Sequence, residues 1–169
     1  MVVCLAIVLV AAVVKLVPAA VEAAQSTRRL PVYSVDGRGK TVSLSFDAAW
    51  GNEDTQTLIN ILGKYKVHAT FFVVGEWVDK YPESVKALSS AGEEVMNHSN
   101  THPHMPQLSR ADMLAQIKAC DDKVEKVTGK RPTLFRAPFG DYNNALVDTV
   151  SETGHTCIQW DVETFDTNV

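Results

Sequence analysis

Cysteine is scarce in this sequence: Cys4, Cys120 and Cys157 are the only three among 169 residues. Two cysteines in the folded part of a chain do not make a disulfide framework. Cys120 continues an apolar stripe with helical spacing, and Cys157 lies in a strand-like run, so both are predicted to be buried small hydrophobic residues. A small fold held by disulfides is therefore excluded.

An excess of positive charge is also missing. Sixteen Lys and Arg residues stand against twenty Asp and Glu residues, which gives a formal net charge of −4. A nucleic-acid partner would require a basic face, so none is expected. The sequence has no internal repeat and no low-complexity tract. Its 46% apolar and 21% charged residues are typical of one globular domain.

No hydrophobic run is long enough to span a membrane by itself. Residues 1–14 are uncharged but fall short of the roughly 18–20 residues that a spanning helix needs. Residues 1–24 are predicted to be a signal peptide, with a small-residue cleavage site at Val-Glu-Ala, or a short membrane anchor through residues 1–17. The alternative is a buried N-terminal helix. The protein is accordingly expected to be secreted or held at the cell envelope, with residues 25–39 as a linker and hairpin-like turn.

Strand and helix patterns alternate along the rest of the chain. Strands are predicted over residues 41–46, 69–74, 93–96, 133–135 and 156–160, and helices over residues 54–66, 77–90, 109–128 and 143–153. This alternation predicts a parallel α/β sheet or barrel. Polar residues that follow the strands are then the candidate site residues, because such folds place their chemistry at the carboxyl ends of the strands.

Two histidines follow the strand predicted at 93–96, within the segment Asn-His-Ser-Asn-Thr-His-Pro. His98 and His102 are four residues apart, and neutral imidazoles bind Zn²⁺ and similar metals. Pro103 disfavours a helical conformation at His102, so the pair is predicted to lie on a tight turn. We interpret them as metal ligands, against the alternative of structural histidines. The other three histidines (His68, His104 and His155) are expected in surface or packing roles.

A carboxylate and an arginine complete the candidate site. Asp47 ends an apolar strand, where an unpaired carboxylate is costly. It is predicted to be a general base that takes a proton from a metal-bound water, or else a cap, a role that Asn52 and Asp54 can fill instead. Arg136 opens the segment Arg-Ala-Pro-Phe-Gly and can hold a carboxylate with two hydrogen bonds, so it is predicted to orient Asp47.

With these motifs in order, the sequence from about Lys40 to Val169 resembles the polysaccharide deacetylases of carbohydrate esterase family 4. The motifs are Ser-Phe-Asp, His-Ser-x-x-His-Pro, Arg-x-Pro-Phe-Gly and Trp-Asp-x-Glu-x-x-Asp. The variety with Ser-Phe-Asp-Ala-Ala-Trp-Gly-Asn is most similar, and includes sporulation and cell-wall proteins of Gram-positive bacteria. The resemblance implies an α/β fold, a deformed (β/α) barrel, that removes N-acetyl groups from peptidoglycan or a chitin-like glycan.

The resemblance also implies roles for individual residues. Asp47 would be the base, Arg136 its orienting partner, and His98 and His102 the ligands of a divalent metal, with zinc as the first choice and Co, Ni or Mn as alternatives. The oxyanion and substrate side of the site would lie at a backbone N–H near Phe139 and at Trp160. The acidic residues Glu163 and Asp166 are interpreted as a second shell around the site, or as a solvated face.

Three departures from the family pattern leave alternatives open. Ala48 stands where the family has a metal-binding aspartate; the alternatives are a weaker site of two histidines and waters, and replacement of the ligand by Asn52 or Asp54. Thr167 stands where a tryptophan would help to wall the acetyl pocket. The family's Leu-x-His motif, which supplies the general acid, would lie beyond residue 169, so this segment is expected to be incomplete at its C-terminal end and weak or inactive alone. The alternatives are a non-catalytic glycan-binding or spore-wall protein on the same fold, and an amidohydrolase of small amides.

Overall fold

The computed structural model describes residues 28–37 and 39–164, which form one α/β unit. Its strands are β1 (Ser45–Ala48), β2 (Thr70–Val73), β3 (Glu94–Asn97), β4 (Leu134–Phe135) and β5 (Thr156–Cys157). Its α-helices are α2 (Thr55–Tyr65), α3 (Gly75–Lys80), α4 (Pro82–Ser90), α5 (Arg110–Thr128) and α6 (Asn144–Glu152), with short 3-10 turns η1 (Met105–Gln107) and η2 (Pro138–Gly140). The predicted signal or anchor, the cleavage site, Asp166 and Thr167 lie outside the described residues.

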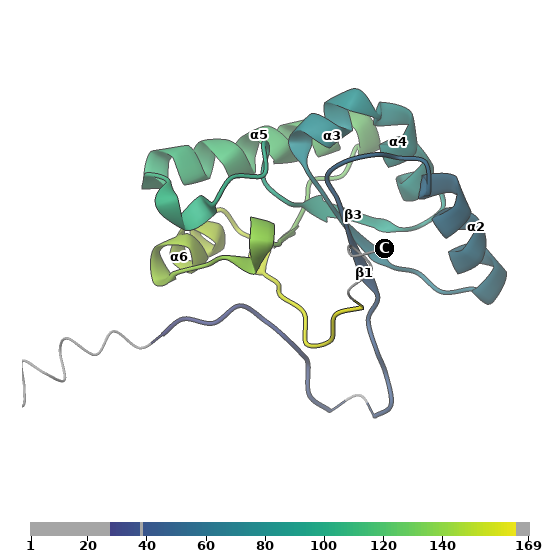
Figure 1. Ribbon diagram of the computed structural model, residues 1–169, viewed down its shortest axis with the longest axis horizontal. Coiled ribbons are helices and arrows are strands. Elements are labelled where there is room, and N and C mark those ends of the chain that lie inside the picture. Colours follow the sequence, from purple (N-terminus) through teal and green to yellow (C-terminus); the bar gives the residue numbers. More distant parts are fainter. Residues whose placement is uncertain (1–27, 38, 165–169) are drawn as a thin grey trace, which may run out of the picture.

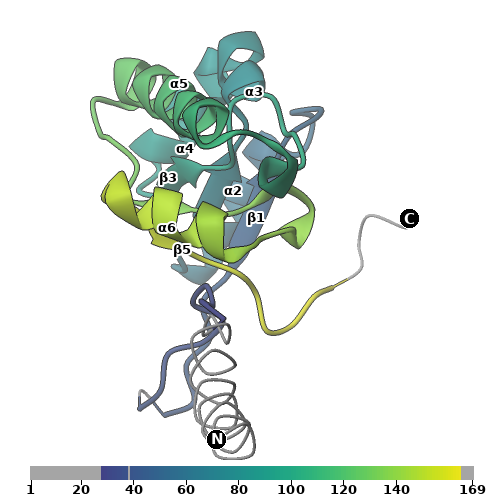
Figure 2. The ribbon, with the colours of Figure 1, turned by 90° about the vertical axis from the view of Figure 1, so that its left-hand side faces the viewer.

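The five strands form one parallel sheet in the order β1-β2-β3-β4-β5, so each strand lies next to the one before it in the chain. The helices that connect them form an arc along the sheet (Figure 1), and Figure 2 shows them stacked above the strands from the side. Sequential parallel strands joined by helices are the arrangement of a (β/α) barrel wall. The predicted parallel α/β fold is confirmed.

The segment before β1 differs from the predicted hairpin-like turn. Val32 makes an isolated parallel bridge with Ile158, and its N–H donates to Cys157 O at 2.8 Å. Gln159 N–H donates back to Val32 O at 2.8 Å. Part of the predicted linker therefore pairs with the edge of the sheet beyond β5, because that edge offers unpaired backbone groups.

Two predicted helix ends agree with the structure for the expected reasons. Ser109 caps α5 with its side chain, which accepts a hydrogen bond from Asp112 N–H. Gly129 ends α5 with φ 71°, a left-handed conformation that glycine adopts without steric cost. Strand β2 is buried at all four positions, as predicted for a strand covered on both faces.

Other predicted bounds were wrong. The helix predicted over 77–90 is two helices, α3 and α4, with a break at Tyr81 (φ −132°, ψ 53°). The cause is Pro82, which disfavours the helical conformation in the residue before it and starts α4 instead. The strand predicted over 41–46 lies further along, at Ser45–Ala48, so Asp47 is inside β1. The strand predicted over 156–160 ends at Cys157.

Two apolar clusters form the core. The first joins α2, β2, β3, α3, α4 and α5 (Leu62, Ala69, Phe71, Val73, Val74, Trp77, Val78, Val85, Leu88, Val95, Cys120 and Val124). The second joins η1, β4, β5, α5 and α6 (Met105, Met113, Ile117, Phe135, Ala137, Leu146, Val150 and Cys157). Cys120 and Cys157 are buried as predicted, and burial raises the pKa of each thiol to about 12. Within residues 28–37 and 39–164, no helix has the length and apolar character needed to cross a membrane.

Candidate active site

Three of the predicted site residues meet at the carboxyl ends of the strands. Asp47 comes from β1, His98 directly follows β3, and Arg136 directly follows β4. Arg136 Nη1 donates to Asp47 Oδ1 at 2.7 Å, and His98 Nε2 lies 3.7 Å from Asp47 Oδ2. The expectation that Arg136 contacts Asp47 is met, across 89 positions of sequence.

Arg136 is held so firmly that its orientation is fixed. Its side chain is 5% exposed, and Nη2 donates to Ser45 Oγ at 2.7 Å. The guanidinium also lies over the ring of Phe72 at 4.1 Å and near that of Trp160 at 5.5 Å. Ser45 and Asp47 are two residues apart on one strand, so they share a face and can bind one guanidinium together. The carboxylate of Asp47 consequently keeps one oxygen on Arg136 and presents the other to the site.

The tautomer of His98 follows from its backbone contact. His98 Nδ1 lies 2.8 Å from the carbonyl oxygen of Arg136, which can only accept, so Nδ1 carries the proton. Nε2 then bears a lone pair and faces Asp47 Oδ2. Burial lowers the pKa of His98 below its usual 6.5, and this outweighs the opposing effect of Asp47. The imidazole is therefore neutral at neutral pH, the form that binds metals.

The loop from Asn97 to His102 is a tight turn, as predicted. Ser99 and His102 both have left-handed backbones, with φ 67° and φ 57°. The Oδ1 atom of Asn97 accepts from Ser99 N–H at 2.8 Å, and Ser99 Oγ accepts from His102 N–H at 3.0 Å. This turn brings the rings of His98 and His102 together, with centroids 5.0 Å apart. Burial also lowers the pKa of His102.

The donor set fits a divalent metal, but it supplies few ligands. The lone pairs of His98 Nε2 and Asp47 Oδ2 face each other with no proton to share, an arrangement that a cation satisfies. Ala48 supplies no ligand and packs against the first core cluster. Across the described residues, no group of three or more His, Cys, Asp and Glu side chains is arranged to hold a metal ion.

The two residues that could replace the missing ligand have other places in the structure. Asn52 donates its side-chain amide to Ser84 Oγ at 3.0 Å, and Asp54 stands at the N-terminus of α2. Among the described residues Asp54 forms no group of three with the two histidines. The imidazoles of His98 and His102 are therefore left as the candidate ligands at this edge of the sheet, with the remaining positions open to water.

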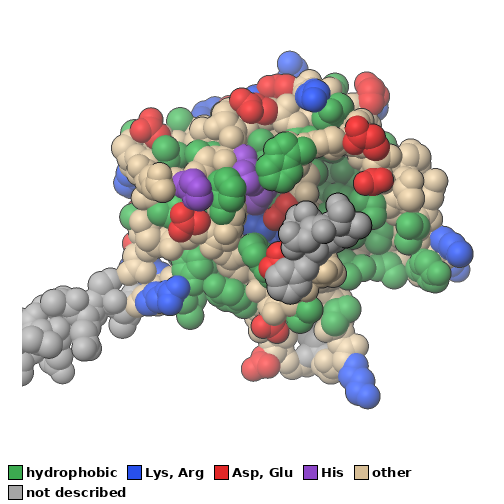
Figure 3. Space-filling view, in the orientation of Figure 1, with side chains coloured by type: hydrophobic (Ala, Val, Ile, Leu, Met, Phe, Trp, Pro, Cys, Tyr) green, Lys and Arg blue, Asp and Glu red, His purple; other side chains and the backbone are tan. Residues whose placement is uncertain are grey.

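Aromatic rings surround His102 at the surface. The ring centroid of Phe139 lies 4.5 Å from that of His102 and 4.2 Å from that of His104, and Trp50 lies 5.4 Å from His102 on another side. Phe139 is 58% exposed and Trp50 is 74% exposed. Side chains of these types gather at the open face in Figure 3. His104 forms an ion pair with Asp141 at 3.3 Å, in line with the expected surface role.

The remaining predicted residues divide into two groups. Trp160 packs close to Gly140, where an added Cβ would lie 2.8 Å from Trp160 Cη2, so it lines the site beside Arg136. Glu163 is exposed, and within the described part of the chain the ion pair of Arg136 is made with Asp47 and not with Glu163. No contact of Glu163 in the structure therefore supports a role for it around the site, and Asp166 lies outside the described residues.

Sequence reasoning missed two residues that the structure brings to the site. Ser45 accepts a hydrogen bond from the same guanidinium that binds Asp47. The alternation of side chains along a strand could have indicated this, because it places Ser45 and Asp47 on one face. Trp50 lies against His102, which no sequence spacing indicates. Away from the site, His155 is buried, in line with the expected packing role, and its Nε2 lies 3.1 Å from Asp121 Oδ1. That pair depends on a tertiary contact between α5 and the segment before β5.

The fold and this site define a class of carbohydrate-modifying hydrolases. Residues 34–158 match the model of the polysaccharide deacetylase family, so the chain belongs to that family. It is 40% identical over 133 residues to the peptidoglycan-N-acetylmuramic acid deacetylase PdaC of Bacillus subtilis, an alignment that covers 79% of this chain and 28% of PdaC. The chain thus spans less than a third of that relative's length.

Solved structures agree on the fold but differ in stated activity. A family 4 carbohydrate esterase from Streptomyces lividans, in complex with acetate, is 37% identical with a TM-score of 0.72, covering 77% of this chain and 67% of that one. A family 4 pseudoenzyme from Bacillus anthracis is 33% identical with a TM-score of 0.80, covering 82% of this chain and 50% of that one. A mutant of this pseudoenzyme is described as having restored enzymatic activity.

Proposed function

We propose that the intact protein removes N-acetyl groups from a cell-wall polysaccharide by metal-assisted amide hydrolysis. The observation that carries this proposal is the contact between Arg136, Asp47 and His98. One carboxylate oxygen is bound by a buried guanidinium, and the other faces an imidazole nitrogen that bears a lone pair. A carboxylate that is oriented but not fully neutralised is suited to accept a proton from a water molecule.

Each residue has a separate task in this mechanism. A divalent ion held by His98 and His102 would lower the pKa of a bound water and polarise the amide carbonyl. Asp47 accepts the proton of the attacking water through the oxygen that Arg136 leaves free. Arg136 keeps the carboxylate in place, and a backbone N–H near Phe139 donates to the developing oxyanion. Zinc is the proposed ion, since imidazole and oxygen donors suit it, with Co, Ni and Mn as alternatives.

The proposed substrate is peptidoglycan or a chitin-like oligosaccharide. Support comes from the relatives, because PdaC and PdaA of Bacillus subtilis are named as peptidoglycan-N-acetylmuramic acid deacetylases. The exposed rings of Trp50 and Phe139 beside His102 offer apolar surface for a sugar ring at the mouth of the site. Comparing acetate release from peptidoglycan, chitopentaose and a monomeric amide decides the substrate class.

The test of the catalytic role is Asp47→Asn in the intact protein. Asparagine keeps an oxygen for Arg136 but is no base, so acetate release should fall by about 100- to 10,000-fold. Asp54→Asn is the matched control, since Asp54 is an exposed carboxylate at the N-terminus of α2. Equal activity of the Asp47 variant and the control would rule out Asp47 as the base.

A second candidate is a non-catalytic glycan-binding or spore-wall protein on the same fold. Two observations favour it: Ala48 supplies no metal ligand, and the chain resembles a family 4 pseudoenzyme with a TM-score of 0.80. Equilibrium dialysis with Zn²⁺ separates the candidates. Glycan binding without metal uptake or acetate release supports this one, whereas metal uptake with acetate release supports the deacetylase.

We also propose that the protein acts outside the cytoplasmic membrane. The uncharged residues 1–14 support this location, as does a cell-wall substrate. Fractionation of cells that produce the intact protein tests it, by comparing the culture medium, the membrane and the cytoplasm. Recovery in the medium indicates a cleaved signal, and recovery with the membrane indicates an anchor. Recovery in the cytoplasm contradicts the proposal.

A further inference from the structure

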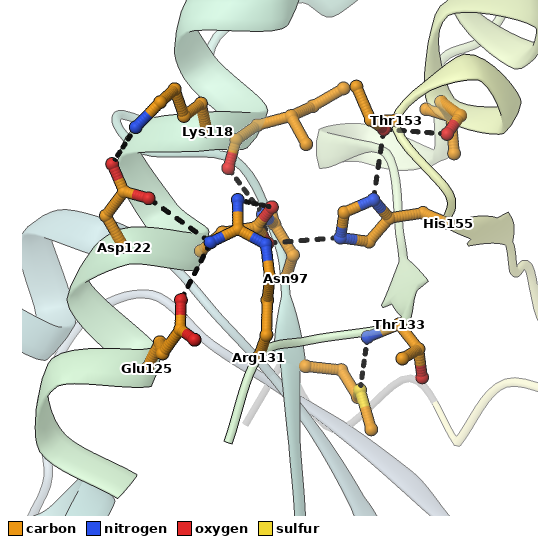
Figure 4. A network of polar contacts seen from close by, with 12 residues as sticks. Asn97, Lys118, Asp122, Glu125, Arg131, Thr133, Thr153 and His155 are labelled. Carbon is orange, nitrogen blue, oxygen red and sulfur yellow. Dashed lines mark hydrogen bonds and ion pairs between the residues drawn. The ribbon is translucent and has the colours of Figure 1, made fainter. Parts of the chain in front are cut away.

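A second polar cluster lies beneath the histidine loop, away from the catalytic carboxylate. Its centre is Asp121 on α5, a carboxylate that is only 1% exposed. Figure 4 shows the network around it, which joins α5 to the last residue of β3, to the segment before β4 and to the segment that follows α6. The proposed mechanism uses none of these side chains directly.

Asp121 is fully occupied by three partners. Oδ1 accepts from Asn97 Nδ2 at 2.7 Å and lies 3.1 Å from His155 Nε2, and Oδ2 lies 3.2 Å from Arg131 Nη2. Arg131 is half-exposed and also binds Asp122 and Glu125, so its charge is shared with acidic groups at the surface. A buried carboxylate with this set of donors is held in one orientation.

Asn97 connects Asp121 to the histidine loop through hydrogen bonds of its side chain. Its side-chain nitrogen donates to Asp121 and to Ile117 O at 2.8 Å, which leaves Oδ1 to accept from Ser99 N–H. This bond holds Ser99 in its left-handed conformation, which is uncommon for a residue other than glycine. Ser99 Oγ in turn accepts from His102 N–H. A continuous chain of hydrogen bonds thus runs from Asp121 to the second histidine.

An apolar side chain would serve α5 better if packing were the only need. Met113 and Ile117 precede Asp121 at intervals of four residues on this helix and are buried in the second core cluster. Replacing a buried ionic group by a well-packed apolar one is often neutral or stabilising. A charge at this position is better explained by what it orients than by the stability that it adds.

We propose that Asp121 is a positioning residue for the histidine pair, acting through Asn97 and Ser99. This inference rests on the proposed function in one respect, namely that His98 and His102 bind a metal. Partners one step removed from metal ligands typically change metal affinity by about 10- to 100-fold when they are substituted, and Asp121 acts on His102 through Asn97 and Ser99, so its effect is expected at or below the lower end of that range. Loss of the acceptor oxygens of Asp121 should therefore weaken metal binding without any contact to the metal.

The experiment compares three variants of the intact protein. Asp121→Leu removes the acceptor oxygens while keeping a similar volume, and Asp121→Asn keeps one acceptor for Asn97 while Arg131 retains Asp122 and Glu125. Val150→Ala is the control, because the side chain of Val150 is fully buried in the second core cluster and takes no part in the hydrogen bonds from Asp121 to His102, while its backbone carbonyl, which accepts from Thr153 and His155, is unchanged by the substitution. Zn²⁺ affinity is measured by equilibrium dialysis and Tm by thermal unfolding. The rate of amide hydrogen exchange at Ser99 and His102 is measured in metal-free protein.

We expect Asp121→Leu to weaken Zn²⁺ binding by up to about tenfold and to speed exchange at both amides, and Asp121→Asn to restore both. Val150→Ala should lower Tm and change neither. If Asp121→Leu lowers Tm but leaves Zn²⁺ affinity and exchange as in Val150→Ala, the positioning role is overturned. If Asp121→Leu does not fold, Asn97→Ala breaks the same chain and carries the same expectations.

The exchange measurement separates this inference from the proposed function. If the unsubstituted protein takes up no Zn²⁺, the metal-dependent function fails, yet faster exchange at Ser99 and His102 in Asp121→Leu still supports the positioning role. Unchanged exchange overturns it whatever the metal result.

Discussion

The two sides of the site are built differently. On the β3 side, the loop from Asn97 to His102 is fastened to α5, with Asn97 bound to Asp121 and Gln116 Oε1 accepting from the N–H groups of Asn100 and Thr101 at 2.9 Å each. On the β1 side, Asp47 is 36% exposed and is held by Arg136, and the next residue is an alanine.

In the proposed metal site, the histidine loop is therefore ordered by the chain itself, whereas Ala48 offers no ligand on the β1 side. The histidine loop is organised without a metal, because its backbone N–H groups already have acceptors within the chain. The β1 side carries the base but lacks a carboxylate at Ala48. An ordered histidine loop beside an alanine at position 48 is consistent with a deacetylase that binds its metal weakly, and also with a protein that only binds glycan. Substitutions on the β1 side and on the β3 side of the site distinguish these two functions.

The largest effect is expected from Ala48→Asp, which restores a carboxylate at the position where the family pattern has a metal ligand. If the histidine loop is organised for a metal, Zn²⁺ affinity should rise by about 100-fold or more, because a direct ligand contributes more than the partners beyond the ligands, which change affinity by about 10- to 100-fold. Equilibrium dialysis of the intact protein measures it. Ala49→Asp adds the same charge one residue further, and an equal gain there would show a general electrostatic effect instead of a ligand.

Arg136→Lys should have the next largest effect. Lysine presents a single ammonium in place of a planar fork, so it cannot hold Asp47 and Ser45 with the same geometry while lying over Phe72. The free energy of unfolding should fall by about 2 kcal/mol, the typical value for hydrogen bonds to charged groups. Urea denaturation measures this loss. Arg110→Lys, at an exposed ion pair with Glu152, is the control that should change little.

Sequence could predict the histidine turn because its determinants are local. Pro103 excludes a helical conformation at His102, and Asn97 and Ser99 are residues whose side chains bond to nearby backbone. The ends of α5 were predictable for the same reason, since Ser109 and Gly129 act within one turn of the helix.

The remaining features depend on contacts that are distant in sequence. His155 reaches Asp121 across 34 positions, and Trp50 reaches His102 across 52, so no local spacing reports either pair. The pairing of Val32 with Ile158 also joins residues that are distant in sequence, and it places part of the predicted linker at the edge of the sheet. The break at Tyr81 has a local cause, because Pro82 disfavours a helical conformation in the residue before it. The helical pattern continues on both sides of Pro82, and the sequence was therefore interpreted as one helix.

Gln116→Leu tests the fastening of the loop at its outer side, with a smaller expected effect. The side chain accepts from two backbone N–H groups, and one of them is exposed and can bond to water instead. The free energy of unfolding should fall by about 1 kcal/mol, and Zn²⁺ affinity should fall by a few-fold at most. Gln56→Leu is a matched control on α2, where the glutamine bonds to Asn60 at the surface. A loss of equal size in both variants would mean that the loop gains nothing specific from α5.

The smallest effect is the pH dependence that comes from His98. Burial lowers the pKa of His98 in the folded protein, whereas the unfolded chain titrates near 6.5. Below pH 6.5 the unfolded state therefore binds more protons than the folded state, and stability decreases as the pH falls toward the lowered pKa.

Urea denaturation of metal-free protein from about pH 8 down to about pH 5 should show this decline. His98→Asn should reduce its slope, because asparagine can still donate to Arg136 O but takes up no proton in either state. An identical slope in the two proteins would mean that His98 is protonated equally in both states. The imidazole would then not be held neutral by burial, and the loop after β3 would be less ready to bind a metal than its hydrogen bonds imply.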